Sequence, residues 1–259
     1  MKHLGILLLA VFCSTSGGAL LYAQAPSVRG PGSVAEQYLF SAANSERAQR
    51  GLTLLRWDDA LYRAAQAHAR EMASRASISH QYPGEMELAA RGHQAGFRFS
   101  SIAENVAQAS TAVRIHEAWM NSPGHRENLL DPQSNAVGIS VLSRNGQLYA
   151  VQDFGRTVDD LTFDEQEHTV ASLLTSITPL TLLTMQEDAR LTCAMAQGYA
   201  GTRSPSFVFR YTSGDLGVLP EMLQRKLASG LYHEAAVGAC APKDVQSFSY
   251  FNIVVLLYP

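Results

Sequence analysis

The chain has 259 residues, of which 46% are hydrophobic, so it is long enough to bury the core of one large domain or two small ones. Its formal net charge is −3 and its pI is near 6.2, without a concentrated run of lysine or arginine. This composition excludes the basic surface that nucleic-acid-binding proteins use, so we expect no nucleic-acid partner.

Residues 1–25 are typical of an export signal. The charged Lys2 comes before an apolar run over residues 4–12, and small residues lead to Ala23-Gln24-Ala25. The apolar run is too short to span a bilayer as a stable helix, and no later stretch is both long and uncharged enough to do so. We therefore expect a secreted or periplasmic protein without a transmembrane segment, processed after Ala25 or after Ala23.

A linker over residues 26–33, rich in proline and glycine, precedes the first predicted helix. That helix begins near Ser33, whose hydroxyl forms a capping pair with Glu36 three residues later. Apolar residues then recur at helical spacing until Gly51, which ends the helix. One face of this helix is therefore expected to be buried.

A short strand is predicted over residues 52–57, and a second helix over 58–74. His68 lies on the apolar face of this helix, so we interpret it as a packed histidine and not as a ligand. Periodicity is weak over residues 75–100, which contain several glycines and a proline. His80 lies at the start of this irregular segment, where its side chain is free to face a cleft, and by composition alone His93 is an equal candidate.

A carboxylate interrupts the next apolar strand. The strand predicted over residues 102–107 contains Glu104 between Ala103 and Val106. If this side chain is buried, it needs a charged or hydrogen-bonded partner. Hydrogen bonds to backbone amides are the alternative to a pairing with histidine.

A third main helix, over residues 111–121, buries Trp119 and ends at Ser122-Pro123-Gly124. His125 follows, on what we expect to be a short turn. Two strands, over 137–142 and 147–154, then form a hairpin around Asn145-Gly146.

His80, His125 and Glu104 therefore stand at the ends or middle of separate elements. Two imidazoles and one carboxylate form the donor set of an open metal site or of an acid–base site. The sequence predicts these three as ligands of Zn²⁺ or another divalent cation, with Glu104 either ligating or orienting a bound water.

The order of several sequence blocks resembles the bacterial branch of the CAP superfamily, which groups secreted SCP-like proteins with plant pathogenesis-related proteins and venom allergens. The blocks are NSERAQRGLTLLRWDDALYRAAQAHAREMA, SH, ENVA, HEAWMNSPGHRENLL, VGISV and YAVQDFG. They occur in this order between residues 34 and 157.

The resemblance implies an α+β fold for residues 34–158, a three-layer α-β-α sandwich around a cleft lined by two histidines and two acids. It selects His80 over His93 as the first site histidine, because the family's histidine follows a serine at the end of its helix. It also implies an acid on the helix that carries Trp119, where this chain has Ser122. We expect four further residues to support the cleft: Asn105, Trp119, Arg126 and Asn128.

Residues 159–259 form a further α+β region, and two of its segments repeat earlier ones. Thr53-Leu54-Leu55 recurs as Thr181-Leu182-Leu183, and Ala136-Val137-Gly138 recurs as Ala236-Val237-Gly238. We interpret the region as a degenerate CAP-like repeat that has lost the cleft, the alternative being an unrelated α+β domain. Cys193 and Cys240 are expected to form one disulfide in an oxidising compartment, the alternative being two buried thiols.

Three classes of function remain open. The resemblance suggests a secreted protein that binds a lipid or sterol. A metal-dependent hydrolase of peptidase type would use Glu104 as its general base. An interaction module would recruit a cell-surface ligand without catalysis. The sequence contains no dedicated nucleophile and no HExxH helix, so binding is favoured over catalysis.

Overall fold

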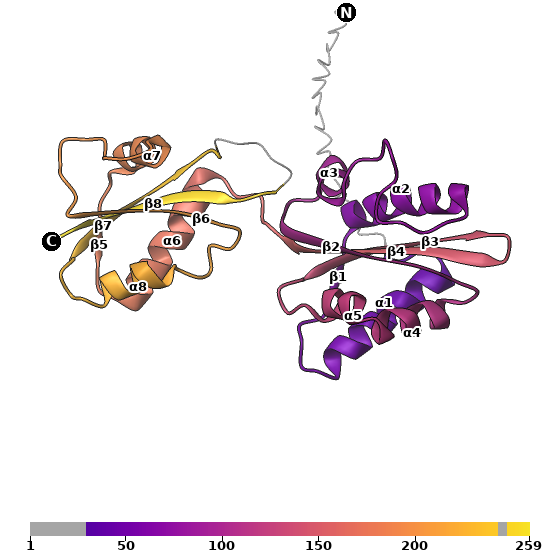
Figure 1. Ribbon diagram of the computed structural model, residues 1–259. Coiled ribbons are helices and arrows are strands. Elements are labelled where there is room, and N and C mark those ends of the chain that lie inside the picture. The colour runs from indigo at the N-terminus through magenta and orange to yellow at the C-terminus, as the bar shows by residue number, and fades with distance from the viewer. Residues whose placement is uncertain (1–29, 243–247) are drawn as a thin grey trace, which may run out of the picture.

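The computed structural model describes residues 30–242 and 248–259 (Figure 1). The predicted export signal and residues 26–29 of the linker lie outside this part of the chain. Two four-stranded sheets follow one another along the chain, each covered by helices on both faces. Across the described residues, no helix combines the length and the apolar character needed to cross a membrane.

The first sheet has the strand order β1-β3-β4-β2. Its strands are β1 (Arg56–Trp57), β2 (Phe99–Ala109), β3 (Ala136–Arg144) and β4 (Gln147–Thr157). β1 pairs with β3 in parallel, and the other two pairings are antiparallel. One face carries α2 (Asp59–Arg75) and α3 (Leu88–Gln94), and the other carries α1 (Val34–Ala48), α4 (Ala112–Asn121) and α5 (Pro123–Leu130) (Figure 1). The predicted three-layer sandwich is confirmed.

Local signals explain most element boundaries. Ser33 and Glu36 form the predicted capping box of α1, and the Asp58 side chain caps α2 through the Ala60 and Leu61 amides. The β3–β4 hairpin turns at Asn145 and Gly146, which both have positive φ, as its tight turn requires.

The strand predicted over residues 52–57 is wrong in length, because only Arg56–Trp57 is extended and paired. Side chains of α1 form hydrogen bonds with the backbone groups of the residues that precede Arg56. The Thr53 carbonyl accepts from Arg47 Nε at 2.8 Å, and both polar backbone groups of Leu55 bond the Asn44 amide. These groups are therefore satisfied without a strand ladder.

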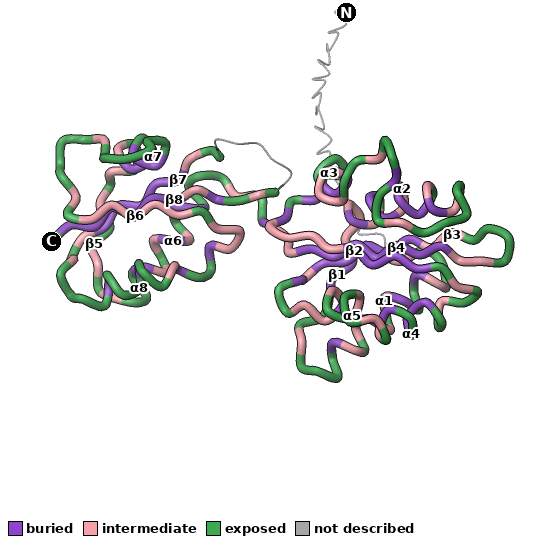
Figure 2. The backbone as a smooth tube through the Cα atoms, in the orientation of Figure 1, coloured by how far each residue is buried: buried purple, intermediate pink, exposed green. Residues whose placement is uncertain are grey.

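Buried residues concentrate on the strands and on the helix surfaces that face them (Figure 2). Trp119 is almost completely buried between α4 and the sheet, and its Nε1 donates to the Val106 carbonyl at 3.1 Å. On the opposite face, α2 crosses β3 at Gly138, where an added Cβ would lie 2.0 Å from the Tyr62 nitrogen. Only glycine permits this close approach of helix and strand.

The second sheet has the strand order β5-β7-β8-β6. Its strands are β5 (Thr181–Leu182), β6 (Phe207–Ser213), β7 (Glu234–Cys240) and β8 (Phe251–Tyr258). α7 (Gln186–Ala194) covers one face, and α6 (Phe163–Ile177) and α8 (Glu221–Leu227) cover the other (Figure 1). The order and directions of the strands match those of the first sheet, which supports the repeat that the sequence predicts.

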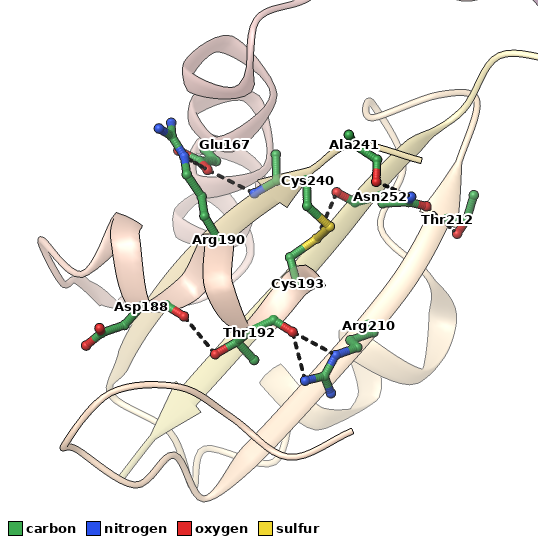
Figure 3. Close-up of a disulfide and its surroundings, with 11 residues drawn as sticks. Glu167, Asp188, Arg190, Thr192, Cys193, Arg210, Thr212, Cys240, Ala241 and Asn252 are labelled. Carbon is green, nitrogen blue, oxygen red and sulfur yellow. Dashed lines mark hydrogen bonds and ion pairs between the residues drawn. A yellow bond between two sulfur atoms is a disulfide. The ribbon is translucent and has the colours of Figure 1, made fainter. Parts of the chain in front are cut away.

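A disulfide joins Cys193 on α7 to Cys240 at the end of β7, with their Cα atoms 5.7 Å apart (Figure 3). The predicted bridge is thereby confirmed. It closes a loop with a sequence separation of 47 residues and fastens the helix of one layer to the sheet.

Replacing both cysteines, as Cys193→Ala/Cys240→Ala, should lower the free energy of unfolding of residues 159–259 by about 4 kcal/mol, because the unfolded chain regains the entropy of a long open loop. Denaturant unfolding followed by circular dichroism measures this loss. The wild-type chain under reducing conditions is the matched control, since it loses the bond and keeps both side chains. An unchanged unfolding midpoint in both samples would contradict the expected role.

Candidate functional site

The candidate site is built around two consecutive residues of β2, the outermost strand of the first sheet. Glu104 and Asn105 point to opposite faces because side chains alternate along a strand. Glu104 faces the layer of α2 and α3, and Asn105 faces α5. Groups held by the two side chains can therefore meet beside the free edge of β2.

Glu104 holds the first predicted histidine. His80 lies in the segment beyond the end of α2, and its Nδ1 is 2.9 Å from Glu104 Oε1. The His80 side chain is 62% exposed, whereas Glu104 is buried. The ring is thus fixed at one nitrogen from below while the rest of it faces solvent.

Asn105 holds the second predicted histidine through its backbone, since Asn105 Nδ2 donates to the His125 carbonyl at 2.9 Å. The rings of His80 and His125 lie with their centroids 6.4 Å apart. The structure therefore brings His80, His125 and Glu104 together from three separate elements.

The expectation that His125 lies on a turn is wrong. His125 belongs to the first turn of α5, whose first residue is Pro123. Proline at this position ends the preceding helix and begins a new one, because its missing N–H is not needed there. Arg47 of α1 fixes the far end of α5 by donating to the carbonyls of Leu129 and Asp131, both at 2.9 Å.

The four residues predicted to support the cleft have different roles. Asn128 Nδ2 donates to the Glu104 carbonyl at 3.2 Å and to Asn105 Oδ1 at 3.0 Å, and so ties α5 to β2. Trp119 belongs to the core beneath it. Arg126 is exposed, and its guanidinium donates to the Met120 carbonyl at 3.4 Å.

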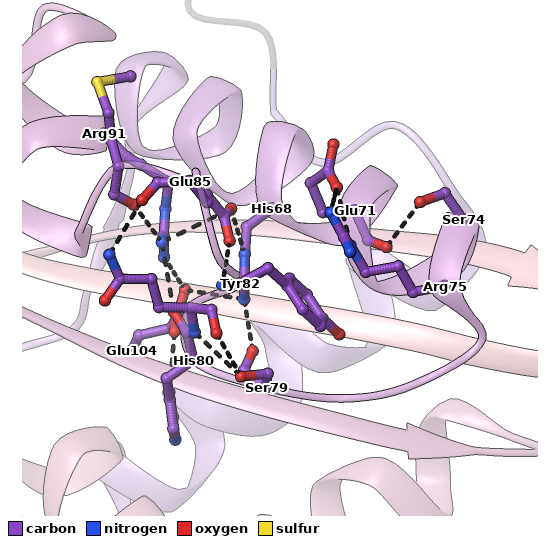
Figure 4. Close-up of polar contacts among 12 residues, drawn as sticks. His68, Glu71, Ser74, Arg75, Ser79, His80, Tyr82, Glu85, Arg91 and Glu104 are labelled. Atoms are coloured by element: carbon purple, nitrogen blue, oxygen red, sulfur yellow. Dashed lines mark hydrogen bonds and ion pairs between the residues drawn. The ribbon is translucent and has the colours of Figure 1, made fainter.

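The acid implied for the helix of Trp119 is absent, because Ser122 only separates α4 from α5. Charged partners come instead from the opposite layer (Figure 4). Arg91 Nη2 donates to Glu104 Oε2 in a short contact. Its Nη1 donates to the carbonyls of His80, at 3.3 Å, and Met86, at 3.1 Å. Arg91 therefore holds the His80 segment both directly and through Glu104.

His68 is completely buried on α2, as a packed histidine should be, but its neighbours are polar. Its Nδ1 lies 2.6 Å from Glu85 Oε1, and its Nε2 lies 2.7 Å from the Ser79 carbonyl. A carbonyl only accepts, so His68 Nε2 donates its N–H to the Ser79 carbonyl. The short distance between His68 Nδ1 and Glu85 Oε1 is that of a second hydrogen bond. This pair anchors the residue before His80.

Asp153 on β4 is the cross-strand neighbour of Glu104 and is completely buried. Neither of its carboxyl oxygens has a hydrogen-bond partner within the described residues. Burial raises the pKa of Asp153 well above its ordinary value, and the nearby charge of Glu104 raises it further. Asp153 therefore keeps its proton to a higher pH than an ordinary aspartate does.

The two site histidines differ in basicity. The hydrogen bond to Glu104 raises the pKa of His80, against a smaller opposing effect of burial. Burial lowers the pKa of His125, and the neighbouring charge of His80 lowers it further. His125 is therefore the imidazole that more readily stays neutral, as a metal ligand must.

The donor set fits a metal with two protein ligands better than one with three. Both oxygens of Glu104 are engaged, by His80 and by Arg91. Over residues 30–242 and 248–259, no three His, Cys, Asp or Glu side chains are grouped so as to hold a metal ion. His80 and His125 remain as solvent-facing nitrogen donors, and Glu104 orients His80 from behind.

Comparison with known proteins identifies this arrangement. Residues 40–154 match the CAP family, described as the cysteine-rich secretory protein family. The chain contains a CAP domain of the bacterial type. Within that domain, the match begins inside α1 and ends at Phe154 of β4, so it contains His80, Glu104 and His125.

Two Bacillus subtilis proteins are similar to the CAP domain. The uncharacterized protein YkwD is 30% identical over 122 residues, which are 47% of this chain and 47% of YkwD. The uncharacterized membrane protein YlbC is 31% identical over 113 residues, 41% of this chain and 31% of YlbC. The chain thus spans half or less of these relatives' length.

Two solved structures are each similar to about half of this chain. An extracellular protein with an SCP domain from Bacillus anthracis is 29% identical, with a TM-score of 0.44, covering 50% of this chain and 45% of that one. An outer surface protein from Borrelia burgdorferi is 26% identical, with a TM-score of 0.45, covering 48% and 92%.

The substitution Asp153→Asn tests the buried carboxyl pair. Because the folded-state pKa of Asp153 lies above the unfolded value of about 3.9, wild-type stability falls as the pH rises through that interval. The asparagine stays neutral, so the variant should gain stability relative to wild type over the same interval, by about 1.4 kcal/mol for each unit of pKa difference. Denaturant unfolding at pH 4 and pH 8 measures this gain.

Glu127→Gln, at an exposed position of α5, is the matched control and should show no such dependence on pH. A stability difference between Asp153→Asn and wild type that is equal at both pH values would contradict a protonated Asp153.

Proposed function

We propose that the protein is an extracellular CAP-domain binding protein whose cleft takes up a divalent cation, with zinc the best chemical match, through His80 and His125. The observation that carries this proposal is the paired imidazoles beside β2, one held by a carboxylate at Nδ1. Such a hydrogen bond leaves Nε2 as the coordinating nitrogen. Two protein ligands leave positions open for water or for groups of a bound ligand.

The same geometry favours binding over hydrolysis. A metal-dependent hydrolase needs a carboxylate that is free to take a proton from bound water. Both Glu104 oxygens are instead engaged, one accepting from Arg91 and the other facing His80 Nδ1, and Asp153 is completely buried beside it. In the described part of the cleft, Glu104 therefore orients His80, and neither Glu104 nor Asp153 is left as a solvent-accessible carboxylate to take a proton from bound water.

Zinc analysis of the purified protein tests the proposal. Wild type should retain close to one equivalent after dialysis against micromolar zinc, and His80→Ala/His125→Ala should lose most of it, because the remaining groups in the cleft are already paired. His93→Ala, on the exposed face of α3, is the matched control. Equal zinc content in wild type and the double variant would remove the metal from the proposal.

A lipid or sterol is the second candidate ligand, and a different surface supports it. Three apolar side chains are exposed on the paired helices α1 and α4: Val34 (82%), Tyr38 (38%) and Val113 (46%). His116 of α4 packs edge-on against Tyr38, with ring centroids 6.5 Å apart, so the two helices touch at this place. Exposed apolar side chains on two helices that touch are suited to an apolar ligand.

The substitution pair Tyr38→Ser/Val113→Ser should reduce binding of a fluorescent sterol or fatty acid about thirtyfold, since two apolar contacts of roughly 1 kcal/mol each are lost. Fluorescence titration measures the change. Met222→Ser, at an exposed apolar position of α8, serves as the control. Equal affinity in all three proteins would count against a lipid at the α1–α4 surface.

A further inference from the structure

Strand register relates the candidate site to a position in the second sheet. In the first sheet, Gly138 of β3 lies opposite Asp153, which in turn lies opposite Glu104 of the edge strand. In the second sheet, Gly238 of β7 lies opposite Val254, which lies opposite Arg210 of the edge strand β6.

The two glycines mark equivalent places in the fold. An added Cβ at Gly238 would lie 2.3 Å from the backbone of Ala189 on α7, just as Gly138 lies against α2. Arg210 therefore stands where the first unit has Glu104, and Val254 stands where it has Asp153. The charge at this position of the sheet is reversed.

The guanidinium of Arg210 contacts only neutral groups in the described part of the chain (Figure 3). Its Nε and Nη2 donate to the Thr192 carbonyl at 3.1 and 2.9 Å, and Nη2 also donates to the Gly198 carbonyl at 2.5 Å. Nη1 makes no hydrogen bond to any described residue. Burial lowers the pKa of Arg210, which is the sign of a cation that has lost water without gaining an anion.

The other arginines of residues 159–259 differ in this respect. Arg190 pairs with Glu167 and Asp164, Arg203 with Glu234, and Arg225 with Glu221. Arg210 has no carboxylate within ion-pair distance among the described residues. A partly buried cation of this kind is stabilised by a bound anion.

A pocket of about 410 Å³ lies beside Arg210. Its polar lining includes Thr212, Asn252 and Tyr250, and the disulfide forms part of its wall. Among the described residues, Arg210 is the one charged residue that lines it. In the first unit, α3 and the segment of His80 cover the corresponding face of the sheet. The chain between α7 and β6 contains no helix, and its Gly198 carbonyl lies against Arg210.

We propose that this pocket binds an oxyanion, a carboxylate, phosphate or sulfate group carried by a small polar molecule, through Arg210. The Nη1 group supplies two N–H donors, and Tyr250 and Asn252 are polar residues in the lining of the same pocket. The second unit thus has an arginine at the sheet position where the first unit has a carboxylate. This inference does not depend on metal binding by the histidines.

Titration with inorganic phosphate and, separately, with acetate tests the proposal by calorimetry and by the thermal unfolding midpoint. Sodium chloride at equal ionic strength controls for screening. Wild type should bind at least one of the two anions with a millimolar or lower Kd, and Arg210→Gln should lose at least tenfold in affinity. Arg225→Gln, which removes an exposed arginine of α8, should bind as wild type does. A response to phosphate but not acetate would assign a phosphate-type ligand, and the reverse a carboxylate.

Several outcomes would overturn the site. One is equal anion binding by wild type and Arg210→Gln, which would reflect general salt stabilisation. Another is a wild type that binds neither anion, in which case Arg210 serves only to cap the last turn of α7.

If Arg210→Gln does not fold, amide chemical shifts of the wild type provide a second readout. Phosphate or acetate should then shift the resonances of Thr212 and Asn252. Unshifted resonances at saturating anion would also overturn the proposal.

Discussion

A buried carboxylate on an edge strand, held from two sides, is the interaction on which the candidate site depends. Glu104 has no access to water, so its charge requires partners, and Arg91 and His80 supply them. Arg91 also binds the His80 backbone, and burial raises the pKa of the neighbouring Asp153, which favours its neutral form. The orientation of the exposed imidazole is therefore fixed from inside the domain, before any ligand arrives.

The two units have the same strand order but carry different residues at the position of this interaction. Both sheets have the same strand order, and a glycine brings one helix against the third strand in each. In the second unit, Arg210 and Val254 stand at the positions of the carboxyl pair. The second unit lacks the covering segment, and a disulfide fastens its helix to the sheet instead. Architecture is thus shared while the chemistry of the edge strand is not.

Sequence patterns predicted the layers, the caps, the hairpin, the disulfide and the group of His80, His125 and Glu104, because each rests on a local signal. Glu104 stands out in the sequence as a carboxylate within an apolar strand. Asp153 in YAVQDFG carries the same signal, although the sequence analysis does not include it in the site. Arg91 and Glu85 lie in a segment without periodicity, where no local pattern reveals a partner far along the chain. The sequence pattern Ser122-Pro123-Gly124 indicates the end of a helix, but Pro123 also begins the next helix, α5. Cross-strand register, which pairs Glu104 with Asp153, depends on tertiary structure.

Nitrogen-15 NMR of the histidine rings, recorded with and without zinc, tests the central claim most directly. The account predicts that His80 carries its proton on Nδ1, facing Glu104, and that zinc shifts Nε2 of His80 together with one ring nitrogen of His125. A His80 ring protonated on Nε2 in the zinc-free protein, or zinc-induced shifts that leave both rings unchanged, would contradict the account.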